Sequence, residues 1–197
     1  FSTGNVYGVV PSGRLSQETD PLNPVGEYAM SCLGRERIFQ YFAQAYDTPI
    51  AILRLNYATE LRYGVIVDLA KKVWAGEAID VTMGYANVIW QTDANAIALS
   101  LLEHASSPAA IFNIAGPEVF RVRDICGRLG RLLDRRPNIT GTEAPDALLS
   151  DGRKASELVG SPRIDLEQIM MWTADWVRRD GATLGKPTHF EVRNGKF

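Results

Sequence analysis

Along the chain, segments in which apolar residues recur with a helical period alternate with short apolar runs that are typical of strands. Short continuous apolar runs bounded by turns, at residues 50–55 and 109–116, are typical of buried parallel strands. Helices are expected at residues 25–45, 64–75, 94–105, 122–134, 153–159 and 166–179. Shorter strands are expected at residues 78–84, 87–91 and 138–140. Because helices alternate with strands, the pattern predicts an α/β layer structure.

Residues at the element ends and in the loops refine this prediction. Gly76 is expected to cap the end of the second helix, and Thr92 or Asp93 the start of the third. Residues 9–24 are rich in Pro, Ser, Gly and Asp and are expected to form a surface loop. Residues 181–197 show no apolar period, so we expect an extended or loosely docked tail.

Composition and charge narrow the class of protein. The chain has 197 residues, of which 46% are hydrophobic and 22% charged, as is ordinary for a globular protein. A net charge of −2 gives no reason to expect binding to nucleic acid or to an anionic membrane. No apolar run reaches the roughly 20 residues that span a bilayer. We therefore expect a soluble protein with neither nucleic acid nor a membrane as partner.

Cysteine and histidine are both scarce. Cys32 and Cys126 fall in helical patterns without metal-ligand spacing, so we expect reduced thiols and no metal site. His104 ends a predicted helix, and His189 lies in the tail with nothing in the sequence to link it to a site. Reduced thiols are typical of the cytoplasm, which is the location we expect.

The N-terminal third carries a more specific pattern. FSTGNVYG (1–8) and VGEYAMSCLGRERIFQYF (25–42) resemble the catalytic segment of the extended short-chain dehydrogenase/reductases, the NAD-dependent epimerase/dehydratase family. Element order extends the resemblance over nearly all of residues 1–180. It implies an α/β fold that comprises the C-terminal part of a Rossmann-type parallel sheet and a small mixed α/β substrate domain.

The resemblance also implies a division into domains. The C-terminal half of the dinucleotide-binding domain would comprise residues 1–60 and 88–118, and the substrate-binding domain residues 61–87 and 119–180, followed by the tail. No strand-flanked G-x-G-x-x-G occurs in the chain. The resemblance places that glycine loop in an N-terminal half, which we expect to precede Phe1 in a longer protein.

Two residues match the catalytic positions that the resemblance implies. Thr3 would orient a substrate hydroxyl, and Tyr28, 25 positions later, would exchange its proton as hydride is transferred to or from NAD or NADP, with NAD preferred. The other residues carried over are cofactor contacts at Phe1, Ser2, Tyr28, Asn56 and Tyr57 and substrate contacts at Gly4 and Asn5. The sequence leaves open whether Asn56 or Tyr57 takes the position beside the nicotinamide.

One position departs from the family pattern. Cys32 stands where the resemblance implies a lysine, whose ammonium group would lower the pKa of the tyrosine one helical turn earlier. A thiol carries no positive charge and is a poor donor to a ribose diol. Arg35, seven residues after Tyr28, is the nearest candidate for a replacement cation, and pairing with a carboxylate is the alternative.

The substrate side departs as well. Ala86 stands where the resemblance implies an arginine that clamps a diphosphate. Glu143, Asp146 and Asp151 lie where a second clamp is expected, and we expect their carboxylates to repel a diphosphate. This favours a smaller or uncharged substrate, such as a free sugar, a sugar acid derivative or a polyol.

Two functions follow. The leading hypothesis is an NAD(P)-dependent oxidoreductase or epimerase that acts on a hydroxylated, sugar-like molecule. The alternative is a non-catalytic relative that still binds a dinucleotide or small ligand as a sensor or scaffold.

The helix at 25–45 carries an apolar stripe of Ile38, Phe39 and Phe42. Family members often dimerise through this helix, so the resemblance implies a homodimer.

Overall fold

The computed structural model describes residues 1–196, and its largest sheet has three parallel strands. These strands, in spatial order, are β1 (Ser2–Thr3), β3 (Ala51–Leu55) and β8 (Ala110–Ile114). Ser2 pairs with Arg54, and Leu55 pairs with Ile114. The two apolar runs of the sequence therefore form adjacent parallel strands, as predicted.

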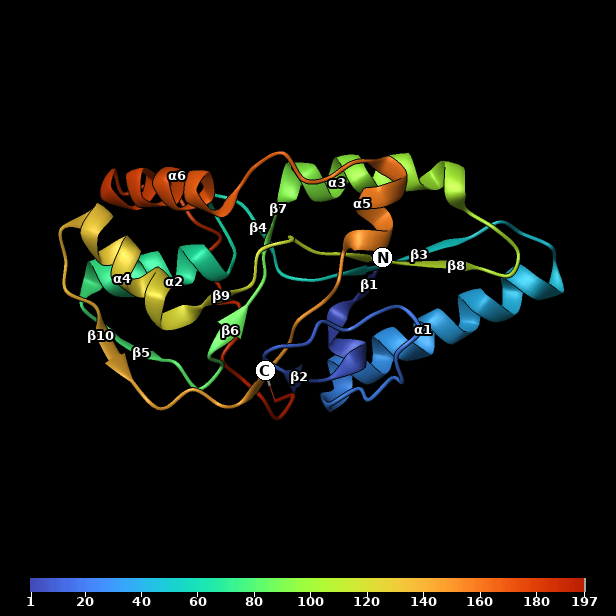
Figure 1. Cartoon of the computed structure of the whole chain (residues 1–197), viewed down its shortest axis with the longest axis horizontal. Helices are drawn as coiled ribbons and strands as arrows, with labels where there is room; N and C mark the ends of the chain where they lie inside the picture. The colour runs from blue at the N-terminus through green and yellow to red at the C-terminus, as the bar shows by residue number, and fades with distance from the viewer. Residues whose placement is uncertain (197) are drawn as a thin grey trace.

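Helices cover the sheet on both sides (Figure 1). They are α1 (Gly26–Ala45) on one side, and α3 (Gln91–Ser100) and α5 (Arg153–Val159) on the other. The short 3-10 helix η2 (Leu101–His104) continues α3. Leu53, Ile97 and Phe112 are buried between the strands and α3.

A second group of helices packs beside the sheet, on the left in Figure 1. It comprises α2 (Val65–Ala75), α4 (Val122–Leu133) and α6 (Leu166–Arg178). Their apolar faces meet in a core that includes Leu69, Leu129 and Ile169. Two strand pairs border them: parallel β5 (Ala78–Asp80) with β10 (Asn138–Thr140), and antiparallel β6 (Tyr85–Ala86) with β9 (Phe120–Arg121).

Short elements connect the two groups. The parallel pair is β4 (Ala58–Thr59) with β7 (Ile89–Trp90), and the antiparallel pair is β2 (Val10–Pro11) with β11 (Asp146–Ala147). The 3-10 helix η1 (Gly4–Tyr7) follows β1 directly. α5 packs on β8 and α3. The predicted domain boundaries stay predictions.

The structure confirms one of two predicted helix caps and contradicts the other. Gly76 adopts the left-handed conformation (φ 70°) after α2 and caps it, as expected. The N-cap expected at Thr92 or Asp93 is wrong, because α3 begins at Gln91 and Trp90 occupies the cap position. Asp93 Oδ2 instead accepts backbone hydrogen bonds from Arg163 (3.0 Å) and Ile164 (2.9 Å). The aspartate thus joins α3 to the loop before α6.

α1 presents an unusual distribution of side chains. The apolar stripe is 59%, 48% and 46% exposed at Ile38, Phe39 and Phe42. The buried face instead carries small or polar residues, including Cys32 and Glu36. Small side chains and a carboxylate on this face allow the helix to approach β1 closely. Among residues 1–196, no helix is long and apolar enough to cross a membrane.

Candidate active site

A cleft of about 440 Å³ opens where β1 and β3 end. In open parallel sheets, ligands bind outside the carboxyl ends of the strands. Five of the predicted site residues line this cleft together: Ser2, Thr3, Asn5, Tyr28 and Tyr57. The structure therefore brings the start of the chain, the first turn of α1 and the end of β3 to one place.

Three predicted site residues do not line the cleft. Phe1 is 67% exposed and lies outside it. Asn56 is buried, and its Nδ2 donates to the backbone oxygen and Oδ1 of Asn87 at 3.1 and 2.9 Å. Gly4 is buried, and a Cβ there would lie 2.8 Å from Asn56 Oδ1 and Ser150 Oγ. Of the two residues left open by the sequence, Tyr57 reaches the cleft.

Thr3 is held in place by the turn that follows it. Its Oγ1 accepts hydrogen bonds from the backbone nitrogen of Asn5 (3.2 Å) and from Asn5 Nδ2 (3.3 Å), and so caps η1. These two hydrogen bonds to Oγ1 fix the rotamer of the threonine side chain. The buried hydroxyl therefore faces the cleft with a defined orientation, beside Tyr28.

Tyr28 lines the cleft with 48% of its surface exposed. Burial of the remainder raises the pKa of its phenol above the usual 10, and this is the largest influence on the group. A hydrogen bond with Thr3 lowers the pKa, the nearby Cys32 raises it, and Arg35 lowers it least. The net direction is upward, so the phenol is protonated at neutral pH.

The thiol of Cys32 is a packed core group. It is 2% exposed and packs against Val6 and Tyr7. Arg35 Nη2 donates to Cys32 Sγ at 3.4 Å, so the guanidinium folds back along α1 toward the cleft. The prediction of two free thiols is confirmed, since Cys32 and Cys126 are both unpaired and buried. Arg35 brings a positive charge near Tyr28, but at a distance that affects the phenol only weakly.

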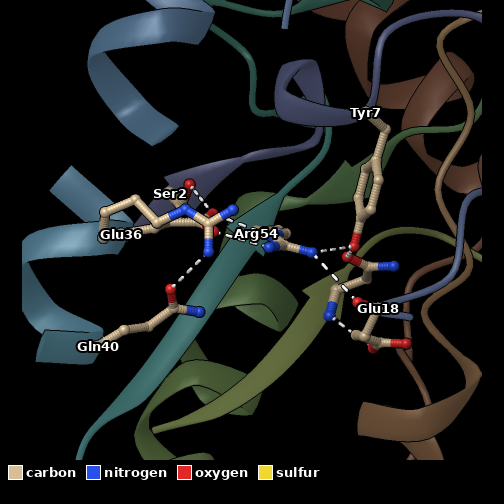
Figure 2. Close-up of polar contacts among 8 residues, drawn as sticks. Ser2, Tyr7, Glu18, Glu36, Gln40 and Arg54 are labelled. Carbon is tan, nitrogen blue, oxygen red and sulfur yellow. Dashed lines mark hydrogen bonds and ion pairs between the residues drawn. The ribbon is translucent and has the colours of Figure 1, made fainter. Parts of the chain in front are cut away.

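Beneath the cleft lies a buried polar cluster, defined here as Ser2, Tyr7, Glu36, Arg54 and Asn113 (Figure 2). Arg54 forms a two-pronged ion pair with Glu36, with Nε–Oε1 at 2.9 Å and Nη2–Oε2 at 2.7 Å. Ser2 Oγ donates to Glu36 Oε1 at 2.5 Å. Arg54 Nη1 donates to Tyr7 Oη at 2.7 Å, and Tyr7 donates to Asn113 Oδ1 at 2.8 Å.

This buried polar cluster positions both catalytic candidates. Ser2 immediately precedes Thr3, and Glu36 lies two turns after Tyr28 on α1. Arg54 on β3 pairs with Glu36, with side chains 2% and 1% exposed, and Ser2 donates to the same carboxylate. Our sequence reasoning missed this cluster. The signal was an arginine inside the apolar run 50–55, which calls for a buried carboxylate partner.

The acidic residues of the predicted second clamp are neutralised. Glu143 accepts from Arg123 at 2.7 Å and pairs with Arg121 at 3.2 Å, and these contacts lower its pKa to about 2. Ion pairs likewise join Asp151 to Arg153 at 2.6 Å and Asp146 to Arg193. Each of these carboxylates is therefore paired with an arginine that the sequence did not identify as its partner, and repulsion of a diphosphate stays a prediction.

The tail supplies residues to the cleft that sequence reasoning did not connect with it. Pro187, Thr188, His189, Phe190 and Val192 form one wall. The expectation of a loosely docked tail is wrong for these residues, since Phe190 is only 3% exposed. Spacing along the chain gives no signal for this contact, because more than 150 residues separate the tail from β1.

Comparison with known proteins places the fold. No protein-family model and no curated protein matches the sequence. Among solved structures, dTDP-glucose 4,6-dehydratase from Bacillus anthracis in complex with NAD superposes with a TM-score of 0.78 at 18% identity, over 91% of this chain and 60% of that one. UDP-glucuronic acid 4-epimerase from Bacillus cereus, with UDP-glucuronic acid and NAD, gives 0.76 at 19% identity over 90% and 60%.

A third structure agrees with these two. UDP-glucose 4-epimerase from Thermus thermophilus, in complex with NAD, gives a TM-score of 0.72 at 21% identity over 92% of this chain and 63% of that one. The chain thus has the fold of NAD-dependent sugar-nucleotide dehydratases and epimerases, as its resemblance implied, and spans about 60% of their length.

Proposed function

We propose that the chain is part of an NAD-dependent oxidoreductase or epimerase that acts on a hydroxylated, sugar-like small molecule. The observation that carries this proposal is the presence of Thr3 and Tyr28 on one cleft at the carboxyl ends of the parallel strands. The fold that the chain shares with NAD-dependent sugar dehydratases and epimerases supports it.

The residues of the cleft have distinct roles in this proposal. Thr3, oriented by Asn5, holds the substrate hydroxyl, and Tyr28 exchanges the hydroxyl proton through its phenol oxygen. Asn5 contacts the substrate from the start of η1. The raised pKa of Tyr28 keeps the phenol protonated at neutral pH, which is the form required for the step in which it donates a proton.

Part of the cleft fits the nicotinamide end of a dinucleotide. Ser2, Tyr28 and Tyr57 are the residues that would hold it, since they line the cleft beside the strand ends. When bound, NAD supplies the hydride acceptor and donor. Position 32 does not fit, because the buried Cys32 thiol cannot donate ammonium-strength hydrogen bonds to a ribose diol. We therefore expect NAD binding, with a weaker grip on the ribose than a lysine would give.

The cleft lining favours an uncharged substrate. It contains no Asp, Glu, Lys or Arg side chain among the described residues. Hydroxyl and amide groups of Thr3 and Asn5 suit sugar hydroxyls, while Tyr57 and Tyr63 offer apolar ring faces. A free sugar or polyol thus fits this lining better than a diphosphate does.

Two measurements test the proposal on the full-length protein. The first is NADH fluorescence on titration with protein, and we expect saturable binding. The second is turnover of D-galactose, D-glucuronate, myo-inositol and UDP-glucuronic acid, followed both as reduction of NAD or NADP and as chromatographic appearance of an epimer, because an epimerase produces no net NADH. Absence of both binding and turnover would overturn the proposal. Turnover of UDP-glucuronic acid alone would overturn the preference for an uncharged substrate.

A specific observation favours a second candidate, a non-catalytic relative that binds a dinucleotide or small ligand. The cation expected one turn after Tyr28 is replaced by a buried thiol, and the pKa of the phenol is raised. NADH binding without turnover of any substrate in the panel would select this candidate. Turnover that is lost in Tyr28→Phe selects the enzyme.

We also propose a homodimer through the exposed face of α1. Ile38, Phe39 and Phe42 expose apolar surface there, which single-chain proteins rarely leave contiguous. We expect Phe39→Glu to shift the sedimentation coefficient toward a monomer. Leu99→Glu is the matched control, because Leu99 is 69% exposed on α3, away from α1. An unchanged sedimentation coefficient for Phe39→Glu contradicts the proposal that this surface forms the dimer.

The cytoplasmic location expected from the thiols stays a prediction.

A further inference from the structure

The chain after α6 runs across the mouth of the cleft as a strap, defined here as residues 183–195. Figure 1 shows this red end of the chain returning to the middle of the molecule, beside β2. The strap carries no helix or strand. Its course is therefore set by contacts with other elements, and these contacts tie it on both sides of the cleft.

On one side the strap is tied to α2. The backbone nitrogen and Oγ1 of Thr188 both donate to Asp68 Oδ2, at 2.7 and 2.6 Å. Glu191 pairs with Lys72 at 3.5 Å. A carboxylate that receives two hydrogen bonds from one residue fixes both its backbone and its side chain. Thr188 is therefore a firm anchor within the cleft wall, immediately before His189.

On the other side the strap reaches β11 and the start of α1. Arg193 Nη1 donates to the backbone oxygen of Asp146 at 2.9 Å. A Cβ placed on Gly26 would collide with the backbone oxygen of Gly195, so the two glycines pack backbone to backbone. Gly26 begins the helix that carries Tyr28 two residues later. The strap thus bridges the two sides of the cleft.

His189 sits at the centre of this bridge. Its backbone adopts the left-handed conformation (φ 53°), which is uncommon for residues with a side chain. Thr188 before it is anchored, and Phe190 after it is 3% exposed in the core. Neighbours fixed on both sides hold His189 in this conformation, with its imidazole exposed and lining the cleft. Backbone strain of this kind concentrates at functional sites.

We propose that the strap forms the substrate-binding wall of the cleft and that His189 contacts the substrate, a neutral polyhydroxylated ring. A neutral imidazole offers one N–H donor and one nitrogen acceptor, which matches a pair of neighbouring ring hydroxyls. Tyr63 lines the cleft beside it and presents apolar surface to the ring. This inference rests on the proposed function and names the substrate class of the same site.

The imidazole C2 proton of His189 reports binding directly by NMR. In the full-length protein, His189→Asn identifies this signal by its loss, and His104→Asn identifies that of the other histidine of this chain. D-galactose, D-glucose, myo-inositol and UDP-glucose are then titrated separately. We expect at least one of the three uncharged compounds to shift the His189 signal in a saturable manner while the His104 signal stays in place.

Kinetics with the compound that is turned over provide the second readout. We expect His189→Ala to raise KM about tenfold with kcat little changed, because a hydrogen bond made equally in the ground and transition states affects binding alone. Asp68→Asn, which weakens the Thr188 anchor, is expected to raise KM in the same direction. His104→Ala is the matched control and leaves both constants unchanged, since His104 lies in η2 and does not line the cleft.

The outcomes separate the two proposals. One result is that a compound is turned over without moving the His189 signal and with the same KM in His189→Ala. That result overturns the role of His189 and leaves the proposed function standing. A shift of the His189 signal by UDP-glucose alone overturns the neutral substrate class. Absence of any shift, together with absence of NADH binding and turnover, overturns both proposals.

Discussion

Two tyrosines of this chain, Tyr7 and Tyr28, lie in contrasting surroundings. Both have a phenol whose pKa is raised, and burial is the largest cause in each case. Tyr7 is 4% exposed and bonded to Arg54 and Asn113. Tyr28 is 48% exposed and lines the cleft with Thr3. A phenol enclosed by protein partners holds elements together, whereas one that faces a cleft can exchange a proton with a ligand.

The same contrast separates the two regions around these tyrosines. In the buried polar cluster, both carboxylate oxygens of Glu36 are bonded to protein donors. A buried ion pair of this kind is sensitive to the loss of either partner. The cleft instead presents hydroxyl, amide and imidazole groups to solvent. Changes in the first region should therefore lower stability, and changes in the second should alter function.

The largest effect is expected from Arg54→Met. This change leaves the Glu36 carboxylate buried without its ion-pair partner, so we expect the free energy of unfolding to fall by about 3–5 kcal/mol. Urea denaturation measures this loss. Arg14→Ala is the control, because Arg14 pairs with Asp20 at the surface with 55% of its side chain exposed, and we expect less than about 1 kcal/mol. Equal losses in the two variants contradict the structural role of the cluster.

Tyr7→Phe is expected to have the next largest effect. It removes the hydroxyl that joins Arg54 to Asn113 and leaves both with an unmet hydrogen bond in the interior, which costs about 1–3 kcal/mol. The free energy of unfolding, measured in urea, should fall by that amount. If Tyr28→Phe lowers the stability as much as Tyr7→Phe does, the distinction between the two tyrosines fails.

Cys32→Lys sharpens the comparison from the side of the cleft. The change replaces a thiol that raises the pKa of Tyr28 with an ammonium group one turn away, so the pKa of the phenol should fall. Each unit of that fall corresponds to about a tenfold change in equilibrium. Phenolate absorbance is followed as a function of pH in Cys32→Lys and in the Cys32→Lys/Tyr28→Phe double variant, and the difference between the two curves gives the pKa of Tyr28. The same subtraction in the unchanged protein gives the reference value. Cys32→Met is the neutral control, and an equal pKa in both variants contradicts the assignment.

The smallest effect is expected from Arg35→Gln. Its guanidinium lowers the pKa of Tyr28 slightly, so its removal should raise that pKa and move the alkaline limb of the pH–rate profile to higher pH. Arg37→Gln is the control, since Arg37 bonds to Gln40 on the exposed side of the same helix. A shift of the limb to lower pH in Arg35→Gln shows that Arg35 does not act on Tyr28.

The elements of this fold were predictable because their signals are local. The apolar run of β3 and the glycine after α2 act within a few residues of the chain. The pairing of Arg54 with Glu36 depends on packing between a strand and a helix, and so was missed. The contacts of Glu143 with Arg121 and Arg123 were missed because they join a loop to residues about 20 positions earlier in the chain.

The candidate site was predictable only in part. Thr3 and Tyr28 were found because they sit in short motifs at a fixed separation. His189 was not, because the strap reaches the cleft through Asp68 and through the packing of Gly195 on Gly26. Neither contact has a sequence pattern of its own. Tertiary contacts between distant segments therefore decide which of the two histidines lies at the site.

We propose that Tyr28 is the group that exchanges a proton in the cleft. The most direct measurement is kcat/KM of the full-length protein and of Tyr28→Phe with the substrate that is turned over, paired with the free energy of unfolding of each. We predict a loss of roughly 10² to 10⁴ in kcat/KM with the stability within about 0.5 kcal/mol of the unchanged protein. Equal kcat/KM in the two proteins would contradict the account.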